Sequence, residues 1–295
     1  MLYDISTTIS YEYERAASAG RHLLRLSPAN ILPDTQRVIT SRLSMTPEPD
    51  ERIEHADFFG NWAVEAAYRE AQEGVEFRLQ ARVLRRAREI GLDISPSIAE
   101  LRQEIAEFRS LGRDAPHHFL GASPRVAPTP EMTAYARRQV TGKMSVRTAV
   151  GAINAALNAD MEFDPEATTV DTSAPDAFAK RRGVCQDFSH IMIACLRGIG
   201  VPAGYVSGFL RTIPPPGKAR LEGADAMHAW VMAWCGTEMG WLEIDPTNAV
   251  IVGADHVVVA RGRDYSDVAP VKGVFRTSGE QSSKHSVDVV PLEQD

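Results

Sequence analysis

The sequence predicts an α+β protein, with a β-sandwich-like domain in residues 1–90 and a mixed domain of helices and strands in residues 131–295. Three observations lead to this expectation. The first part of the chain consists of short alternating segments rich in β-branched and aromatic residues, separated by turn formers. Apolar residues then recur at helical spacing between residues 97 and 200. Finally, residues 228–234 and 240–246 alternate again as strands.

The strand-like segments of the N-terminal part are residues 7–14, 22–26, 37–45 and 75–83. Short strands at this spacing, with Pro, Gly, Asn and Asp between them, are typical of a small antiparallel sandwich. No cluster of reactive side chains lies in this part. We therefore interpret residues 1–90 as a scaffold or interaction domain.

Residues 91–130 are predicted to form a helix followed by a linker. Ser97 and Glu100 have the spacing of a capping box, and apolar residues follow at helical intervals. The rest of the segment is rich in Pro and Gly and holds two adjacent histidines, His117 and His118. Because no companion ligands lie nearby in the sequence, we expect a solvated loop there and no metal site.

Composition excludes several classes of function. The chain of 295 residues carries a net charge of -7, with acids interspersed among its Lys and Arg, so we expect no nucleic-acid partner. No window approaches the roughly 18 apolar residues of a membrane span. The first residues lack the apolar stretch of a signal peptide, so a cytoplasmic location is expected. The chain has three cysteines, which fit neither a disulfide framework nor the spacing of a zinc site: Cys185, Cys195 and Cys235. No cofactor or metal is expected.

Cys185 is predicted to start a buried helix. Phe188, Met192 and Cys195 recur at helical spacing, and Pro202 marks the helix end. Gly183 is expected to end the preceding short helix in a left-handed conformation. Free N–H groups and the helix dipole favour an anion at a helix start, and therefore a nucleophilic thiolate. Cys195 lies on the apolar stripe and reads as a core residue.

A thiolate nucleophile requires a base and a group that orients the base. His228 begins one predicted strand, and Asp245 ends the next, so an antiparallel hairpin brings the two together. If Trp234 lies opposite Met239, His228 lies directly opposite Asp245, with Cβ atoms about 5 Å apart. A slip of one residue would separate the two side chains onto opposite faces.

At these residues the chain resembles the bacterial transglutaminase-like family, whose core is shared with papain-type cysteine proteases. The matching segments are RRGVCQDFSHIMIACLRGIGVPAGYVSGFLRT, GADAMHAWVMAW, GWLEIDPTN and DHVVVARGRDYSDVAPVKG, within residues 163–290. LRLSP and FFGN near the N-terminus resemble the β-rich region that often precedes this core. The resemblance implies a papain-like domain and a catalytic triad of Cys185, His228 and Asp245. The family often has Tyr where this chain has Phe163, so a role for that hydroxyl is absent.

The candidate substrate-binding residues are Gln186, Tyr205, Ser207 and Trp230, and the loop of residues 214–217 is a candidate wall of the cleft. The resemblance implies acyl transfer from an amide of a peptide or protein through a thioester. Hydrolysis is favoured because no calcium loop or dedicated amine site is recognisable. Two alternatives stay open at this point: a protein-glutamine transglutaminase, and a non-catalytic binding module on the same fold. An acetyltransferase fits less well, because no basic pocket for the phosphates of CoA is visible.

Overall fold

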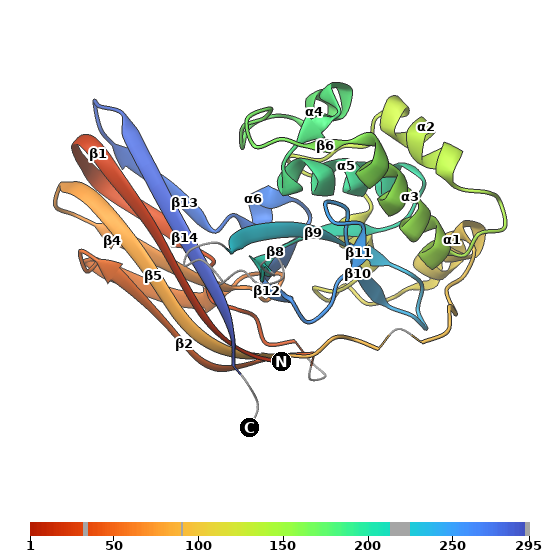
Figure 1. The fold of residues 1–295 in the computed structure, drawn as a ribbon, viewed down its shortest axis with the longest axis horizontal. Coiled ribbons are helices and arrows are strands. Elements are labelled where there is room, and N and C mark those ends of the chain that lie inside the picture. The colour runs from red at the N-terminus through yellow and green to blue at the C-terminus, as the bar shows by residue number, and fades with distance from the viewer. Residues whose placement is uncertain (32–34, 90, 213–224, 293–295) are drawn as a thin grey trace, which may run out of the picture.

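A computed structural model describes residues 1–31, 35–89, 91–212 and 225–292, and Figure 1 shows its fold. In the figure, the N-terminal sheet occupies the left side and the helices gather on the right, with a second sheet between them. None of the helices in these described ranges is long and apolar enough to span a membrane. The mixed helix and strand content confirms the predicted α+β class.

The N-terminal sheet has seven strands, and the long strand β1 connects all of its parts. Its members are β1 (Leu2–Leu24), β2 (Gln36–Thr46), β3 (Glu51–Ala56), β4 (Trp62–Tyr68), β5 (Gln72–Arg85), β13 (Val271–Arg276) and β14 (Gln281–Leu292). The first half of β1 pairs with β5 and β14, and its second half pairs with β4 and β13, all antiparallel.

The two halves of this curled sheet pack against each other as in a sandwich. The His22 ring on the second half of β1 lies 5.3 Å from Phe77 on β5 and 5.8 Å from Tyr68 on β4. Buried apolar residues alternate along β1 and β5, which explains why the strand pattern of the sequence was readable here. β13 and β14 lie in residues 131–295, the segment assigned to the catalytic domain from sequence, yet they pair with β1.

The second sheet has five antiparallel strands in the order β11-β10-β9-β8-β12. These are β8 (Ala203–Leu210), β9 (Ala226–Trp234), β10 (Trp241–Asp245), β11 (Val250–Ile251) and β12 (His256–Gly262). The helices are α1 (Ile98–Glu107), η1 (Pro116–Phe119), α2 (Pro130–Gln139), α3 (Val146–Asp160), α4 (Ala174–Lys180), α5 (Cys185–Gly198) and α6 (Tyr265–Val268). The short strands β6 (Glu162–Phe163) and β7 (Arg182–Gly183) pair in parallel just before α5.

α5 is the central helix of this domain. Every residue of it from Gln186 to Arg197 is buried, and it contacts α2, α3 and α4 as well as the sheet. A helix that is enclosed on all sides has its start fixed by the surrounding structure. The fold therefore holds Cys185, the first residue of α5, in a defined place beside β8 and β9.

Candidate active site

Cys185 lies at the first position of α5 and is partly exposed. The N–H groups of Asp187 and Phe188 donate to the Val184 carbonyl (2.8 and 3.1 Å), so those of Cys185 and Gln186 are the first-turn N–H groups without an acceptor in the helix. The other two cysteines differ from it. Cys195 and Cys235 are buried, and burial raises the pKa of each thiol to about 12. Cys185 is therefore the accessible thiol of the chain.

The entry into α5 depends on Asp187 and Gly183. The Asp187 carboxylate accepts hydrogen bonds from the Val184 N–H (2.8 Å) and the Thr168 hydroxyl (2.7 Å), and so caps the helix start. A Cβ on Gly183 would lie 2.4 Å from that carboxylate, so only glycine fits. The prediction that Gly183 ends the preceding helix was wrong, because Arg181 takes the left-handed conformation there (φ 57°). Glycine is needed at 183 for this close approach.

His228 on β9 and Asp245 on β10 meet as predicted, although the hairpin register differs from the expected one. Trp234 pairs with Trp241 and not with Met239, a shift of two residues. The connection is longer because Gly236 and Gly240 both adopt positive φ angles. A shift of two keeps both side chains on one face of the sheet. The His228 Nε2 and Asp245 Oδ2 atoms are 2.8 Å apart.

His228 is held between a thiol and a carboxylate, and this determines its charge. Burial by itself lowers the pKa of His228. Hydrogen bonds with Asp245 and Cys185, together with the attraction of both groups in their anionic form, outweigh burial and raise that pKa to about 10. Since Nε2 is bonded to Asp245, Nδ1 is the ring nitrogen left for Cys185. The arrangement favours an imidazolium at neutral pH.

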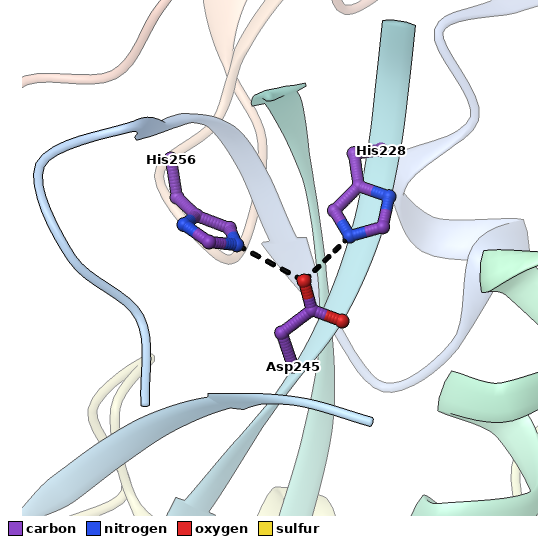
Figure 2. Close-up of side chains that lie close together, drawn as sticks. All are labelled: His228, Asp245 and His256. Carbon is purple, nitrogen blue, oxygen red and sulfur yellow. Dashed lines mark hydrogen bonds and ion pairs between the residues drawn. The ribbon is translucent and has the colours of Figure 1, made fainter. Parts of the chain in front are cut away.

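Asp245 is fully buried and has a second histidine beside it, which the sequence analysis did not single out. His256 Nε2 on β12 lies 3.1 Å from Asp245 Oδ2, the same oxygen that binds His228. Figure 2 shows the two imidazole rings reaching this oxygen from different strands. Burial would raise the pKa of Asp245, but hydrogen bonds from His228, His256 and Asn248 and the charge of His228 hold it well below its usual range.

The ligand-type atoms of His228, Asp245 and His256 lie within 4.8 Å of one another, which is close enough for a shared metal ion. Both Nε2 atoms, however, already lie at hydrogen-bond distance from Oδ2. These contacts describe a hydrogen-bonded cluster. The only clue to His256 in the sequence was its place in the matching segment DHVVVARGRDYSDVAPVKG.

The four candidate substrate-binding residues lie near the site, but most are committed to packing. Gln186 donates its side-chain amide to the Val170 carbonyl (3.0 Å), which leaves its backbone N–H for other partners. Tyr205 is buried, and burial with the nearby Cys185 charge raises its pKa well above 10. Ser207 is buried on β8 opposite Ala229.

The expectation that Trp230 binds substrate was wrong. Its ring is fully buried (0% exposed), its Nε1 donates to Glu243 (2.9 Å), and its edge faces the His256 ring at 5.2 Å. Gly208 makes room for this ring, because a Cβ there would lie 2.4 Å from it. The Trp230 ring also lies 6.2 Å from the ring of His228, so it packs against both histidines. The loop of residues 214–217, the other predicted cleft element, lies outside the described residues.

His117 and His118 lie in the short 3-10 helix η1 and are partly buried, so the prediction of a solvated loop was wrong at these two residues. His117 Nε2 lies 3.0 Å from the Phe108 carbonyl, and His118 Nε2 lies 3.1 Å from the Gly112 carbonyl. Each ring therefore satisfies backbone carbonyls that follow α1.

A cysteine at the start of a buried helix, beside a histidine and a carboxylate on neighbouring antiparallel strands, defines a papain-type core. Comparison with protein families agrees with this class. Residues 133–246 match the transglutaminase-like superfamily, and residues 3–84 match the bacterial transglutaminase-like N-terminal region. The chain belongs to the transglutaminase-like superfamily, which confirms the resemblance recognised in the sequence.

Several known proteins are similar to this chain. An uncharacterized protein of Mycobacterium tuberculosis is 34% identical over 310 residues, covering 99% of this chain and 94% of the relative. A protein-glutamine gamma-glutamyltransferase of Pseudomonas aeruginosa is 37% identical over 87 residues, covering 29% of this chain and 13% of that protein. The crystal structure of a "Putative Cysteine Protease" from Cytophaga hutchinsonii superposes with a TM-score of 0.75 at 23% identity, covering 100% of this chain and 92% of that one.

Proposed function

We propose that this protein is a cysteine-nucleophile enzyme that hydrolyses amide bonds of peptides or proteins. Cys185 would be the nucleophile, His228 the acid and base, and Asp245 the group that orients His228. The observation that carries the proposal is geometric: the imidazole of His228 lies 2.8 Å from the buried carboxylate of Asp245 and beside the partly exposed Cys185 at the start of α5, and both neighbours raise the pKa of His228. An imidazolium in that position stabilises a thiolate at neutral pH.

The reaction would begin with attack of the Cys185 thiolate on the carbonyl carbon of an amide. A carbon–sulfur bond forms, and the negative charge moves to the carbonyl oxygen. As the tetrahedral intermediate collapses, the carbon–nitrogen bond breaks and His228 gives its proton to the leaving amine. The acyl group then remains on Cys185 as a thioester.

Water completes the cycle. His228, now neutral, takes a proton from water as the oxygen attacks the thioester carbon. The carbon–sulfur bond breaks, the carboxylic acid leaves, and the thiolate and imidazolium are restored. Asp245 keeps the proton of His228 on Nε2 throughout, so that Nδ1 faces the sulfur.

The negative oxygen of both tetrahedral intermediates needs donors. The free N–H groups in the first turn of α5 are suited to this role, since they lie at the positive end of the helix dipole. The Gln186 side chain is a weaker candidate because its amide is bonded to Val170.

A second candidate function is amine transfer, in which a primary amine replaces water at the thioester. The similarity to a protein-glutamine gamma-glutamyltransferase of Pseudomonas aeruginosa supports it, since the matched segment of 87 residues is 37% identical. Both functions use the same acyl-enzyme and differ only in the acceptor.

Mass spectrometry of the acyl-enzyme tests this proposal. The protein is mixed with a library of acetylated peptides, some rich in glutamine, quenched in acid and digested. We expect a mass added to the peptide that contains Cys185, and none in Cys185→Ala. Added cadaverine should leave the products as free acids if the enzyme is a hydrolase, or convert them to amides if it is a transferase. Absence of any adduct or turnover across the library would favour a non-catalytic binding module.

A further inference from the structure

Asp245 accepts more hydrogen bonds than its partnership with His228 requires. Its Oδ2 atom accepts from His228 Nε2 (2.8 Å), His256 Nε2 (3.1 Å) and Asn248 Nδ2 (2.7 Å). Its Oδ1 atom accepts from the backbone N–H groups of Thr247 (2.9 Å) and Asn248 (3.2 Å). The donors at Thr247 and Asn248 follow Asp245 in the same turn. His256 is different, because it comes from another strand at the far edge of the sheet.

We propose that His256 is a positioning residue for the catalytic pair: as a neutral imidazole it donates from Nε2 to Asp245 Oδ2 and fixes the carboxylate that orients His228. The inference rests on the proposed function, in which Asp245 orients the base. The two histidines donate to the same oxygen but differ in charge. His228 is charged and exchanges its proton with the substrate, whereas His256 is neutral and keeps its proton.

The neutral state of His256 follows from its surroundings. An ionised carboxylate only accepts hydrogen bonds, so Nε2 must carry a proton. The other ring nitrogen, Nδ1, is buried and has no hydrogen-bond partner among the described residues. A proton on Nδ1 would therefore be a buried donor on a cation without an acceptor, which is costly. The tautomer with a single proton on Nε2 avoids this cost.

His256 is held in place by the N-terminal sheet. The buried guanidinium of Arg85, at the end of β5, donates from Nε to the His256 carbonyl (2.8 Å). The hydroxyl of Tyr3 on β1 donates to the carboxylate of the preceding residue, Asp255 (2.9 Å). Trp230 packs against the ring from the side of β9. Among the described residues, Asp245 contacts the His256 ring, Arg85 contacts its backbone carbonyl, and the His228 ring lies 6.0 Å away.

These contacts connect the N-terminal domain with the chemistry of the catalytic domain. β1 and β5 fix the start of β12, the start of β12 fixes His256, and His256 holds the carboxylate. Without its donor, Oδ2 loses one of three hydrogen bonds, and the carboxylate is free to turn away from His228. Supporting partners of this kind typically change activity by roughly tenfold to a hundredfold in metal sites, and we expect about tenfold here.

The test measures the alkylation rate of Cys185 by iodoacetamide between pH 5 and 9, followed peptide by peptide in the mass spectrometer. This readout needs no substrate, and the buried Cys195 and Cys235 serve as internal references. His256→Leu removes the donor, whereas His256→Gln places an amide nitrogen at about the reach of Nε2. His22→Leu is the matched control, since His22 is also buried and its Nδ1 also lacks a partner among the described residues.

We expect His256→Leu to lower the rate at pH 6 about tenfold, His256→Gln to restore most of it, and His22→Leu to leave it unchanged. Equal alkylation rates in the wild type and both His256 variants would overturn the inference. An equal loss of rate in His256→Leu and His256→Gln would also overturn it, because the shape of the side chain and not its donor would then be what matters. If His256→Leu does not fold, His256→Asn replaces it, because its shorter amide cannot reach Oδ2. A wild-type Cys185 that resists alkylation at every pH would instead contradict the proposed function.

Discussion

Replacing Asp245 by Asn should remove the charge that keeps His228 protonated. The rise in the pKa of His228 from its ordinary 6.5 to about 10 corresponds to roughly 5 kcal/mol in favour of the imidazolium. Burial opposes this charge, and hydrogen bonding to Asp245 is the foremost contribution that overcomes it. In Asp245→Asn we therefore expect the pKa of His228 to fall toward its ordinary value, so that a larger share of the thiol and imidazole pair is neutral at pH 7.

The assay is the alkylation rate of Cys185 by iodoacetamide as a function of pH. The rate is measured from pH 6 to pH 8 in the wild type and in Asp245→Asn. Asp245→Asn should react at least about tenfold more slowly at pH 6 and recover as the pH rises. Turnover should fall further, by on the order of 10⁴, if the amide also selects the wrong tautomer. Asp264→Asn, at another fully buried carboxylate, is the control. A folded Asp245→Asn protein with the wild-type profile would show that the carboxylate does not hold the charge of His228.

Three further outcomes are expected. His228 holds its proton more tightly in the folded protein, so the stability it contributes is complete below pH 6.5 and is lost between pH 6.5 and about 10. Asp245 has a lowered pKa, so it loses its contribution as the pH falls below about 4. The temperature of thermal unfolding should therefore be highest between about pH 4 and pH 6.5, and Asp245→Asn should flatten the curve. Gly183→Ala should lower the free energy of unfolding by about 1–3 kcal/mol, because its Cβ displaces the Asp187 cap; an unchanged urea midpoint would argue against this. Dialysis against EDTA should leave Cys185 alkylation unchanged, and a loss that zinc reverses would show that the cluster of Figure 2 binds metal.

Much of the fold could be predicted because local patterns and tertiary structure agree. Alternation along the N-terminal strands matches their buried faces, and the capping box at Ser97 and Glu100 starts α1. The helix that begins at Cys185 follows the same logic, since its apolar spacing encodes a buried helix. His228 and Asp245 were identified because a hairpin brings its two outer ends together, and the actual shift of two residues kept both side chains on the same face of the sheet.

Features that depend on long-range contacts could not be predicted. The hairpin register shifted by two residues because turn geometry, set by Gly236 and Gly240, cannot be derived from strand patterns. β14 pairs with β1 across almost the whole chain, and no local signal marks such a partner. His256 begins an ordinary apolar strand, so only the folded sheet reveals that it reaches Asp245.

The proposed function requires that a buried carboxylate and a cysteine together keep His228 charged at neutral pH. Histidine-specific NMR titration measures this directly, with the His228 signal assigned from the spectrum of His228→Gln among the eight histidines of the chain. We expect a pKa for His228 of about 10 in the wild type and a lower value in Cys185→Ala. A His228 signal that titrates near 6.5, unchanged by the loss of Cys185, would contradict it.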